Sequence, residues 1–142
     1  ILIFVFYIFF VGPFPEELGW RGYWLDKLRN LMSGFKASLL IAVVWAVWSV
    51  PLFLVKGFTL QARASSFLLV LFYFLQLFPK STIFTYIFYK NQKSTLAAIL
   101  FHFMMNFVGQ LFELSLITEG LQTLFYFILA AIIIGRNRAI FK

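Results

Sequence analysis

The chain has 142 residues, of which 63% are hydrophobic and only 12% are charged, and its mean hydropathy is +0.93. Soluble domains are about 45–50% apolar, so this composition excludes an ordinary soluble protein and indicates an integral membrane protein that contacts the lipid bilayer. The net charge of +7 comes mainly from basic residues between apolar runs, which argues for membrane orientation and against a nucleic-acid partner. Because the chain has no cysteine, disulfides and thiolate metal sites are excluded.

The first apolar segment, residues 1–25, predicts a membrane element that is broken near residues 12–15. Proline suits the first turn of a helix, and acidic side chains favour the positive end of its dipole. We therefore expect a helix to restart at Pro15, with Glu16 and Glu17 in its first turn. Since the chain starts inside an apolar run, without a methionine, we also expect it to be truncated at its N-terminus, with further helices upstream.

Four more apolar segments follow, at residues 37–54, 65–89, 95–112 and 121–134. Pro51 should kink or end the first of these segments. Polar residues around Pro79 and Lys80 interrupt the next one, so we expect a kink there, or a break that faces protein or a watery cavity. The predicted fold is all-α, a polytopic transmembrane helix bundle of about five spans that forms a single domain over residues 1–142.

The charges of the predicted loops differ between the two sides of the bundle. The basic residues on one side are Lys27, Arg29, Lys36, Lys90, Lys93, Arg136, Arg138 and Lys142. The other side has Lys56 and Arg63, together with the acidic residues Glu113 and Glu119 before the last span. The positive-inside rule therefore predicts a multi-pass protein whose C-terminal tail is cytoplasmic.

Two adjacent carboxylates and an arginine form the first candidate site, in a chain that has only five acidic residues. Glu17 and Arg21 are four residues apart and would meet on one face of a helix, whereas Glu16 would point about 100° away. Arg21 could then neutralise Glu17 and leave Glu16 free to act as a general base. The alternative is that both acidic residues only complement a helix N-terminus at the membrane surface.

A second candidate pair, His102 and Asn106, has the same spacing on an otherwise apolar helix. A histidine in a membrane span is either a hydrogen-bonded packing residue or part of a proton or metal site. The asparagine could donate to a developing oxyanion. The alternative is polar contact between helices, worth about 0.6 kcal/mol per bond. A third stretch, Trp45 to Ser49, indicates little by itself, because tryptophans near the end of a span are usually packing or interface residues.

These three stretches, in this order, resemble the CPBP family of intramembrane metalloproteases, which includes the type 2 CAAX prenyl endopeptidases and the Abi bacteriocin-immunity proteins. The Glu-Glu-x-x-x-Arg motif of the family is matched by Glu16, Glu17 and Arg21, and its His-x-x-x-Asn motif is matched by His102 and Asn106. The resemblance covers a family core of residues 12–107.

The second motif of the family, Phe-x-x-x-His within a Trp-His-x-Pro context, is matched in part. Trp45, Trp48 and Pro51 keep the context, but Ser49 occupies the position of the histidine. Serine is a poor metal ligand and cannot exchange a proton near pH 7.

The resemblance implies that Glu16 activates a water molecule, that Arg21 is the structural partner of Glu17, and that His102 and Asn106 polarise the scissile carbonyl. We therefore expect Glu16 to face His102 and Asn106 across the bundle. It also implies a divalent metal, zinc, although a single histidine and a few carboxylates fall short of the three protein ligands of an ordinary catalytic zinc site.

Two functions follow from the resemblance. The first is an endopeptidase, impaired by Ser49, that cuts a lipidated or other membrane-associated peptide at the cytoplasmic edge of the bilayer. The second is a non-catalytic protein that keeps the protease fold and binds a partner such as a bacteriocin-like peptide, as an immunity protein would.

Overall fold

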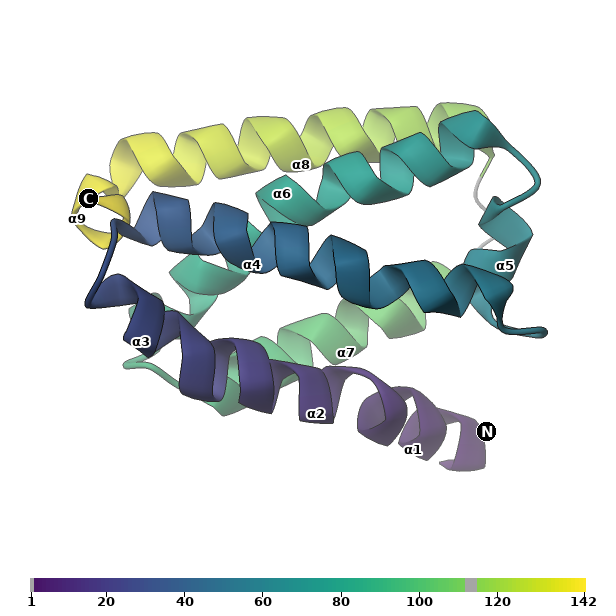
Figure 1. The fold of residues 1–142 in the computed structure, drawn as a ribbon, viewed down its shortest axis with the longest axis horizontal. Helices are drawn as coiled ribbons and strands as arrows, with labels where there is room; N and C mark the ends of the chain where they lie inside the picture. Colours follow the sequence, from purple (N-terminus) through teal and green to yellow (C-terminus); the bar gives the residue numbers. More distant parts are fainter. Residues whose placement is uncertain (1, 112–114) are drawn as a thin grey trace.

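The computed structural model describes residues 2–111 and 115–142, and each of its described elements is a helix (Figure 1). The helical stretches that are long and apolar enough to cross a membrane are Leu2–Arg29, Gly34–Leu54, Phe67–Lys90 and Leu116–Arg136. A shorter apolar helix, α7 (Thr95–Leu111), lies beside them. The predicted all-α membrane bundle of about five spans is confirmed.

The first span is built from four short elements: α1 (Leu2–Val11), α2 (Pro13–Glu17), the π-helix η1 (Leu18–Trp24) and α3 (Leu25–Arg29). The predicted break is at Gly12, whose backbone angles (φ −123°, ψ −79°) interrupt the helix. The helix restarts at Pro13, two residues before the predicted position at Pro15. A proline needs no hydrogen bond for its nitrogen at the first helical position. Glu16 therefore lies in the first turn of α2, and Glu17 is its last residue.

The second span begins as α4 (Gly34–Ser49) and ends as the 3₁₀-helix η2 (Val50–Leu54). Pro51 lies in the first turn of η2, so the prediction that this proline ends the α-helix is confirmed. A short helix, α5 (Thr59–Arg63), then leads to the third span, α6 (Phe67–Lys90).

Helix α6 is continuous for 24 residues, although Pro79 lies inside it. The predicted alternative of a break is therefore wrong, although the buried polar side chains of this helix do face protein. Gln76 and Ser81 are both buried, and both are hydrogen-bonded to side chains or carbonyls of other helices. The helix therefore accommodates its polar residues through contacts with its neighbours.

The last span is α8 (Leu116–Arg136), which is followed by the short helix α9 (Arg138–Phe141). It begins five residues before the predicted start at residue 121, because Ser115 caps it by accepting a hydrogen bond from the backbone N–H of Thr118 at 3.3 Å. The predicted loop position of Glu119 is therefore wrong: Glu119 lies in the first turn of α8 and is only 1% exposed. Glu113 lies outside the described residues.

A buried polar cluster joins α5, α6 and α8, and we call it the α6–α8 polar cluster. Arg63 forms an ion pair with one carboxylate oxygen of Glu119, and Gln76 donates to the other oxygen at 2.8 Å. The amide of Gln76 also donates to Thr123 Oγ1 at 3.0 Å and accepts from Lys80 Nζ at 2.7 Å. Charged residues that are buried in a membrane bundle are costly unless they are paired, and here Glu119 is paired with Arg63 and Lys80 is hydrogen-bonded to Gln76.

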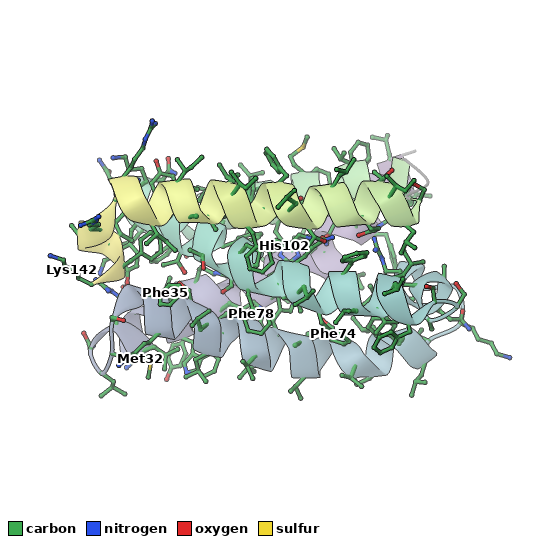
Figure 2. The ribbon with its side chains drawn as sticks, turned by 90° about the horizontal axis from the view of Figure 1, so that it is seen from above. Met32, Phe35, Phe74, Phe78, His102 and Lys142 are labelled. Atoms are coloured by element: carbon green, nitrogen blue, oxygen red, sulfur yellow. The ribbon has the colours of Figure 1, made fainter. Side chains whose placement is uncertain are left out.

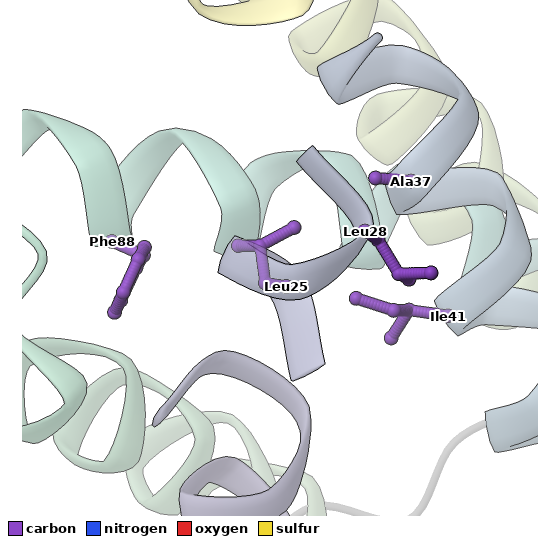
Figure 3. Packing of buried hydrophobic residues seen from close by; sticks show 5 residues of the cluster. All are labelled: Leu25, Leu28, Ala37, Ile41 and Phe88. Atoms are coloured by element: carbon purple, nitrogen blue, oxygen red, sulfur yellow. The ribbon is translucent and has the colours of Figure 1, made fainter. Parts of the chain in front are cut away.

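Two buried apolar clusters hold the helices together. At the α3 end, a buried cluster joins α3, α4 and α6 (Figure 3), and its members are Leu25, Leu28, Ala37, Ile41 and Phe88. A second cluster, formed by Trp45, Leu77, Phe84 and Ala98, packs α4 and α6 against α7. The candidate site lies beside this second cluster.

The basic loop residues gather at one end of the bundle. The ends of α3, α6 and α8, the starts of α4 and α7, and the C-terminus all lie at this end (Figure 1). Arg63, at the opposite end, forms a partly buried ion pair with Glu119. Because both residues belong to that end, the pair leaves its net charge unchanged, and the excess of basic residues stays at the end that holds the C-terminus.

Candidate active site

The first span presents both glutamates and Arg21 to the interior at the point where its helix geometry changes. The break at Gly12 starts α2, and η1 follows Glu17 directly. π-helical turns are rare and occur often at functional sites. Within η1, Gly22 lies against the start of α7, since a β-carbon at this position would be 3.3 Å from the side chain of Thr95. The close approach at Gly22 lets α7 pack directly on the segment that carries the site.

Glu17 is the centre of a buried polar network. Its Oε1 accepts a hydrogen bond from Arg21 Nη1 at 3.1 Å and lies 2.9 Å from Nδ1 of His102. The side chains of Glu17 and Arg21 are both fully buried. The predicted pairing of these two residues is therefore confirmed, in a setting where each charge depends on the other.

Arg21 reaches across the bundle to α6 and α4. Its Nη2 donates to the carbonyl and the hydroxyl oxygens of Ser81 at 3.4 and 3.2 Å, and the Ser81 hydroxyl donates to the carbonyl of Ser38 at 2.8 Å. The guanidinium also lies over the rings of Phe84 and Trp45, 4.6 and 5.7 Å from their centroids. Arg21 thus ties the glutamate segment to the rest of the bundle.

His102 lies about midway along the bundle (Figure 2) and is only 4% exposed. Its ring packs edge-on against Trp45 and Phe84, at centroid distances of 5.2 and 5.3 Å. We expected it to face Glu16, but its hydrogen-bonded carboxylate is Glu17. Sequence spacing could not distinguish the two glutamates, because the rotation of α2 against α7 decides which one meets the imidazole. The other ring nitrogen, Nε2, makes no hydrogen bond to the described residues.

Glu16 is half-buried and lies on the edge of this network. One carboxylate oxygen accepts a hydrogen bond from the indole N–H of Trp48 at 3.2 Å. His102, Glu17 and Arg21 are all near enough to interact with it electrostatically. Within the described part of the chain, no basic side chain forms an ion pair with Glu16. Its carboxylate is therefore the more available of the two.

Asn106 lies one turn further along α7 and faces the break before α2. A β-carbon at Gly12 would be 3.7 Å from its amide nitrogen. His102 and Asn106 thus both face α2, as their four-residue spacing predicted.

Ser49 is buried at the end of α4, and its hydroxyl both donates and accepts a hydrogen bond. It donates to the carbonyl of Trp45 at 2.8 Å and accepts from the phenol of Tyr73 at 2.9 Å. Trp48, the residue before it, is the partner of Glu16. Tyr73 belongs to α6 and was missed by the sequence analysis, because nothing distinguishes it within the aromatic run of residues 72–74.

The described side chains do not fit an ordinary catalytic zinc site. No group of three or more His, Asp or Glu side chains in residues 2–111 and 115–142 is placed to hold a metal ion. Glu17 is held by Arg21, and Ser49 supplies only a hydroxyl. We therefore derive no chemical step that passes through a metal.

The candidate site lies inside the first span, away from the basic end of the bundle. Glu17 lies 12 residues before the end of α3 at Arg29. At roughly 1.5 Å per residue it is about 18 Å from Arg29 along the span. The carboxylates are therefore several helical turns away from the basic end.

Comparisons with known proteins identify the family of the chain. The model of the family described as type II CAAX prenyl endopeptidase Rce1-like matches residues 1–108. The chain is also 35% identical over 138 residues to a protein of Methanococcus maripaludis named CAAX prenyl protease 2. That alignment covers 96% of this chain and 51% of the relative, so the chain spans about half of that protein's length. The carboxylate and histidine motifs, the helical membrane bundle and both matches agree, and the chain belongs to the type II CAAX prenyl endopeptidase Rce1-like family.

Proposed function

We propose that this chain carries the active site of an intramembrane endopeptidase in which Glu16 is the general base. The observation that supports this most directly is the difference between the two adjacent carboxylates. Glu17 is fully buried and bound to Arg21 and His102, whereas Glu16 is half-buried and is held only by a neutral indole N–H. A general base must be able to accept a proton, and a carboxylate without a cationic partner does so more readily.

In the proposed reaction, Glu16 takes a proton from a water molecule whose oxygen attacks the carbonyl carbon of the scissile peptide bond. His102, when both ring nitrogens carry protons, and the amide of Asn106 donate hydrogen bonds to the oxyanion that forms. Glu16 then returns the proton to the amide nitrogen, the carbon–nitrogen bond breaks, and an amine and a carboxylic acid leave. Arg21 keeps Glu17 charged and in place, so that Glu17 holds the Nδ1 side of His102.

We further propose that the substrate is a lipidated peptide. The depth of the carboxylates along the first span favours a substrate that enters from the bilayer, and the name of the Methanococcus maripaludis relative refers to prenyl proteins. The direct test is hydrolysis of a prenylated peptide by the purified protein in H₂¹⁸O. One ¹⁸O atom should appear in the new carboxyl group, as detected by mass spectrometry. Cleavage no faster than that by the Glu16→Gln variant would contradict the proposal.

The second candidate function is a non-catalytic one, in which the same site binds a peptide such as a bacteriocin or another membrane protein. The observation that favours it is Ser49, whose hydroxyl is engaged by Trp45 and Tyr73 and which offers no group that titrates near neutral pH.

The variant Ser49→His distinguishes the two functions. We expect it to raise kcat/KM for peptide hydrolysis by about 10²-fold, because it places an imidazole beside Trp48 and Glu16 that can share the proton transfer. Ser65→His adds the same side chain in an exposed loop and should change nothing. A rise from undetectable activity would support the binding function for the native chain. An unchanged rate in a folded Ser49→His protein would show that position 49 lies outside the reaction.

The orientation of the bundle is also a proposal, and the charge asymmetry supports it. We expect the basic end, with the C-terminus, to face the cytoplasm. Since the chain has no cysteine, single cysteines are clean probes. A membrane-impermeant maleimide should label Lys56→Cys in intact cells but should label Lys142→Cys only after permeabilisation. The reverse pattern would overturn this orientation.

A further inference from the structure

Tyr73 joins the candidate site to the α6–α8 polar cluster. Its hydroxyl donates to Ser49 Oγ at 2.9 Å, one residue away from the Trp48 indole that holds Glu16. The Tyr73 hydroxyl and the Glu16 carboxylate are near enough to interact electrostatically. On its other side, the guanidinium of Arg63 lies over the Tyr73 ring, 5.9 Å from the centroid. Tyr73 therefore contacts both Ser49, beside the residue that holds Glu16, and the partly buried Arg63 of the polar cluster.

The other polar groups around Glu16 are already committed to the fold. The Ser49 proton is donated to the carbonyl of Trp45, and the Trp48 N–H is donated to Glu16 itself. In contrast, the Tyr73 hydroxyl makes a single neutral hydrogen bond to the described residues. Such a bond is worth only about 0.5–1.5 kcal/mol, and a phenol hydrogen can turn to a better acceptor. Tyr73 is thus the donor that can be redirected to a substrate at least cost.

The position of the hydroxyl also suits a catalytic donor. A hydroxyl that is 2.9 Å from Ser49 Oγ lies about 3.7 Å from the β-carbon of residue 49. This is about as far as the Nε2 atom of a histidine at position 49 would reach. Tyr73 thus places a hydrogen-bond donor at about the same distance from the β-carbon of residue 49 as the Nε2 atom of a histidine there would be.

The α6–α8 polar cluster accounts for the fixed position of Tyr73. Arg63 is held over the phenol by its ion pair with Glu119, and Glu119 is held by Gln76. The Tyr73 ring also packs against Phe53 of η2 in a T-shaped contact, at a centroid distance of 5.5 Å. Through these contacts, the paired charges of the cluster help to hold the phenol beside Ser49.

We propose that Tyr73 is a further catalytic residue, which donates a hydrogen bond to the oxyanion formed when water attacks the scissile carbonyl. The inference rests on the proposed endopeptidase function. Tyr73 keeps its proton throughout: the proton that leaves the water goes to Glu16 and then to the departing amine. As the carbonyl oxygen gains negative charge, the phenol turns from Ser49 to this oxygen, and it returns to Ser49 when the carbon–nitrogen bond has broken.

The test is Tyr73→Phe, which removes only the hydroxyl, with Tyr126→Phe as the matched control. Tyr126 is a half-buried tyrosine of α8 beside the polar cluster, and Lys80 Nζ lies 4.9 Å from the centroid of its ring. It makes no described contact with Glu16 or Ser49. We expect Tyr73→Phe to lower kcat for the prenylated peptide about 10²-fold, with KM within about twofold. The control should retain the wild-type rate and unfold at the wild-type temperature, and Tyr73→Phe should lower the unfolding temperature only by the few degrees expected for the loss of one neutral hydrogen bond.

A second measurement tests Tyr73 without turnover. A peptide aldehyde binds as its hydrate, which resembles the tetrahedral intermediate, and Tyr73→Phe should weaken its binding at least 10-fold more than it weakens binding of the parent peptide. If the wild type cleaves the peptide and Tyr73→Phe cleaves it equally fast, the role of Tyr73 is overturned and the endopeptidase function stands. If the wild type does not cleave, the endopeptidase function fails. Equal aldehyde affinity of the two proteins would then overturn the role of Tyr73 as well.

Discussion

Replacing Glu16 with glutamine should lower kcat for peptide hydrolysis by at least about 10³-fold, because an amide cannot accept the proton of the attacking water. The change is nearly isosteric, and the carbonyl oxygen of the glutamine can still accept the hydrogen bond from Trp48. We therefore expect the variant to fold normally and to bind the peptide with an unchanged affinity. The measurement is the single-turnover rate for the prenylated peptide in detergent or bicelles, together with the melting temperature.

Two companion variants make this prediction specific to Glu16. Asp26→Asn makes the same chemical change at the basic end of the bundle, where Asp26 accepts hydrogen bonds from Tyr89 and Lys93, and it should leave the rate unchanged. Glu17→Gln should mainly destabilise the fold, because it leaves Arg21 buried without its partner. If Glu16→Gln kept more than a tenth of the rate, while folded Glu17→Gln lost it, the roles of the two glutamates would be reversed.

The second large effect is expected from Arg21→Met. Methionine has a similar length, so the packing against Phe84 and Trp45 is largely kept while the charge is removed. Glu17 would then be buried without its cation, and the Ser81 oxygens would lose their donor. Breaking a buried ion pair in this way costs about 3–5 kcal/mol. The free energy of unfolding, measured by reversible denaturation in mixed micelles, should fall by that amount.

A double variant shows how much of this loss comes from the pair itself. Arg21→Met combined with Glu17→Gln removes both charges, and it should recover most of the lost stability, since replacing a whole buried pair is far less costly than removing one member. Arg136→Met, at an exposed position at the end of α8, should change the free energy of unfolding by less than about 0.5 kcal/mol. A similar loss in the double variant and in Arg21→Met would mean that Arg21 acts through Ser81 and not through Glu17.

The position of Ser49 connects these predictions to the family resemblance. Its hydroxyl is held by Trp45 and Tyr73, and its neighbour Trp48 holds the general base. If Tyr73 supplies the donor that an imidazole at position 49 would otherwise supply, Tyr73→Phe should matter less in the Ser49→His background than in the native chain. The two substitutions should then be non-additive, as expected for groups that act on one atom.

Sequence alone determined the features that depend on neighbours along the chain. The apolar segments predicted the membrane spans, and the glycine and proline residues before Glu16 predicted the break at Gly12. The four-residue spacing of Glu17 and Arg21 predicted their ion pair, and the order of the motifs indicated the family. Each of these follows from local geometry, because residues one turn apart on a helix meet whatever the helix packs against.

Only the tertiary structure decided which groups meet across the bundle. The tilt and rotation of α2 against α7 place His102 at Glu17 instead of Glu16. The packing of α8 on α6 turns Glu119, predicted in a loop, into the buried partner of Arg63 and Gln76. It is also the packing of α4 on α6 that brings Tyr73 to Ser49. Helix orientation is set by the sum of many apolar contacts, so no local pattern in an aromatic-rich chain could reveal these partners.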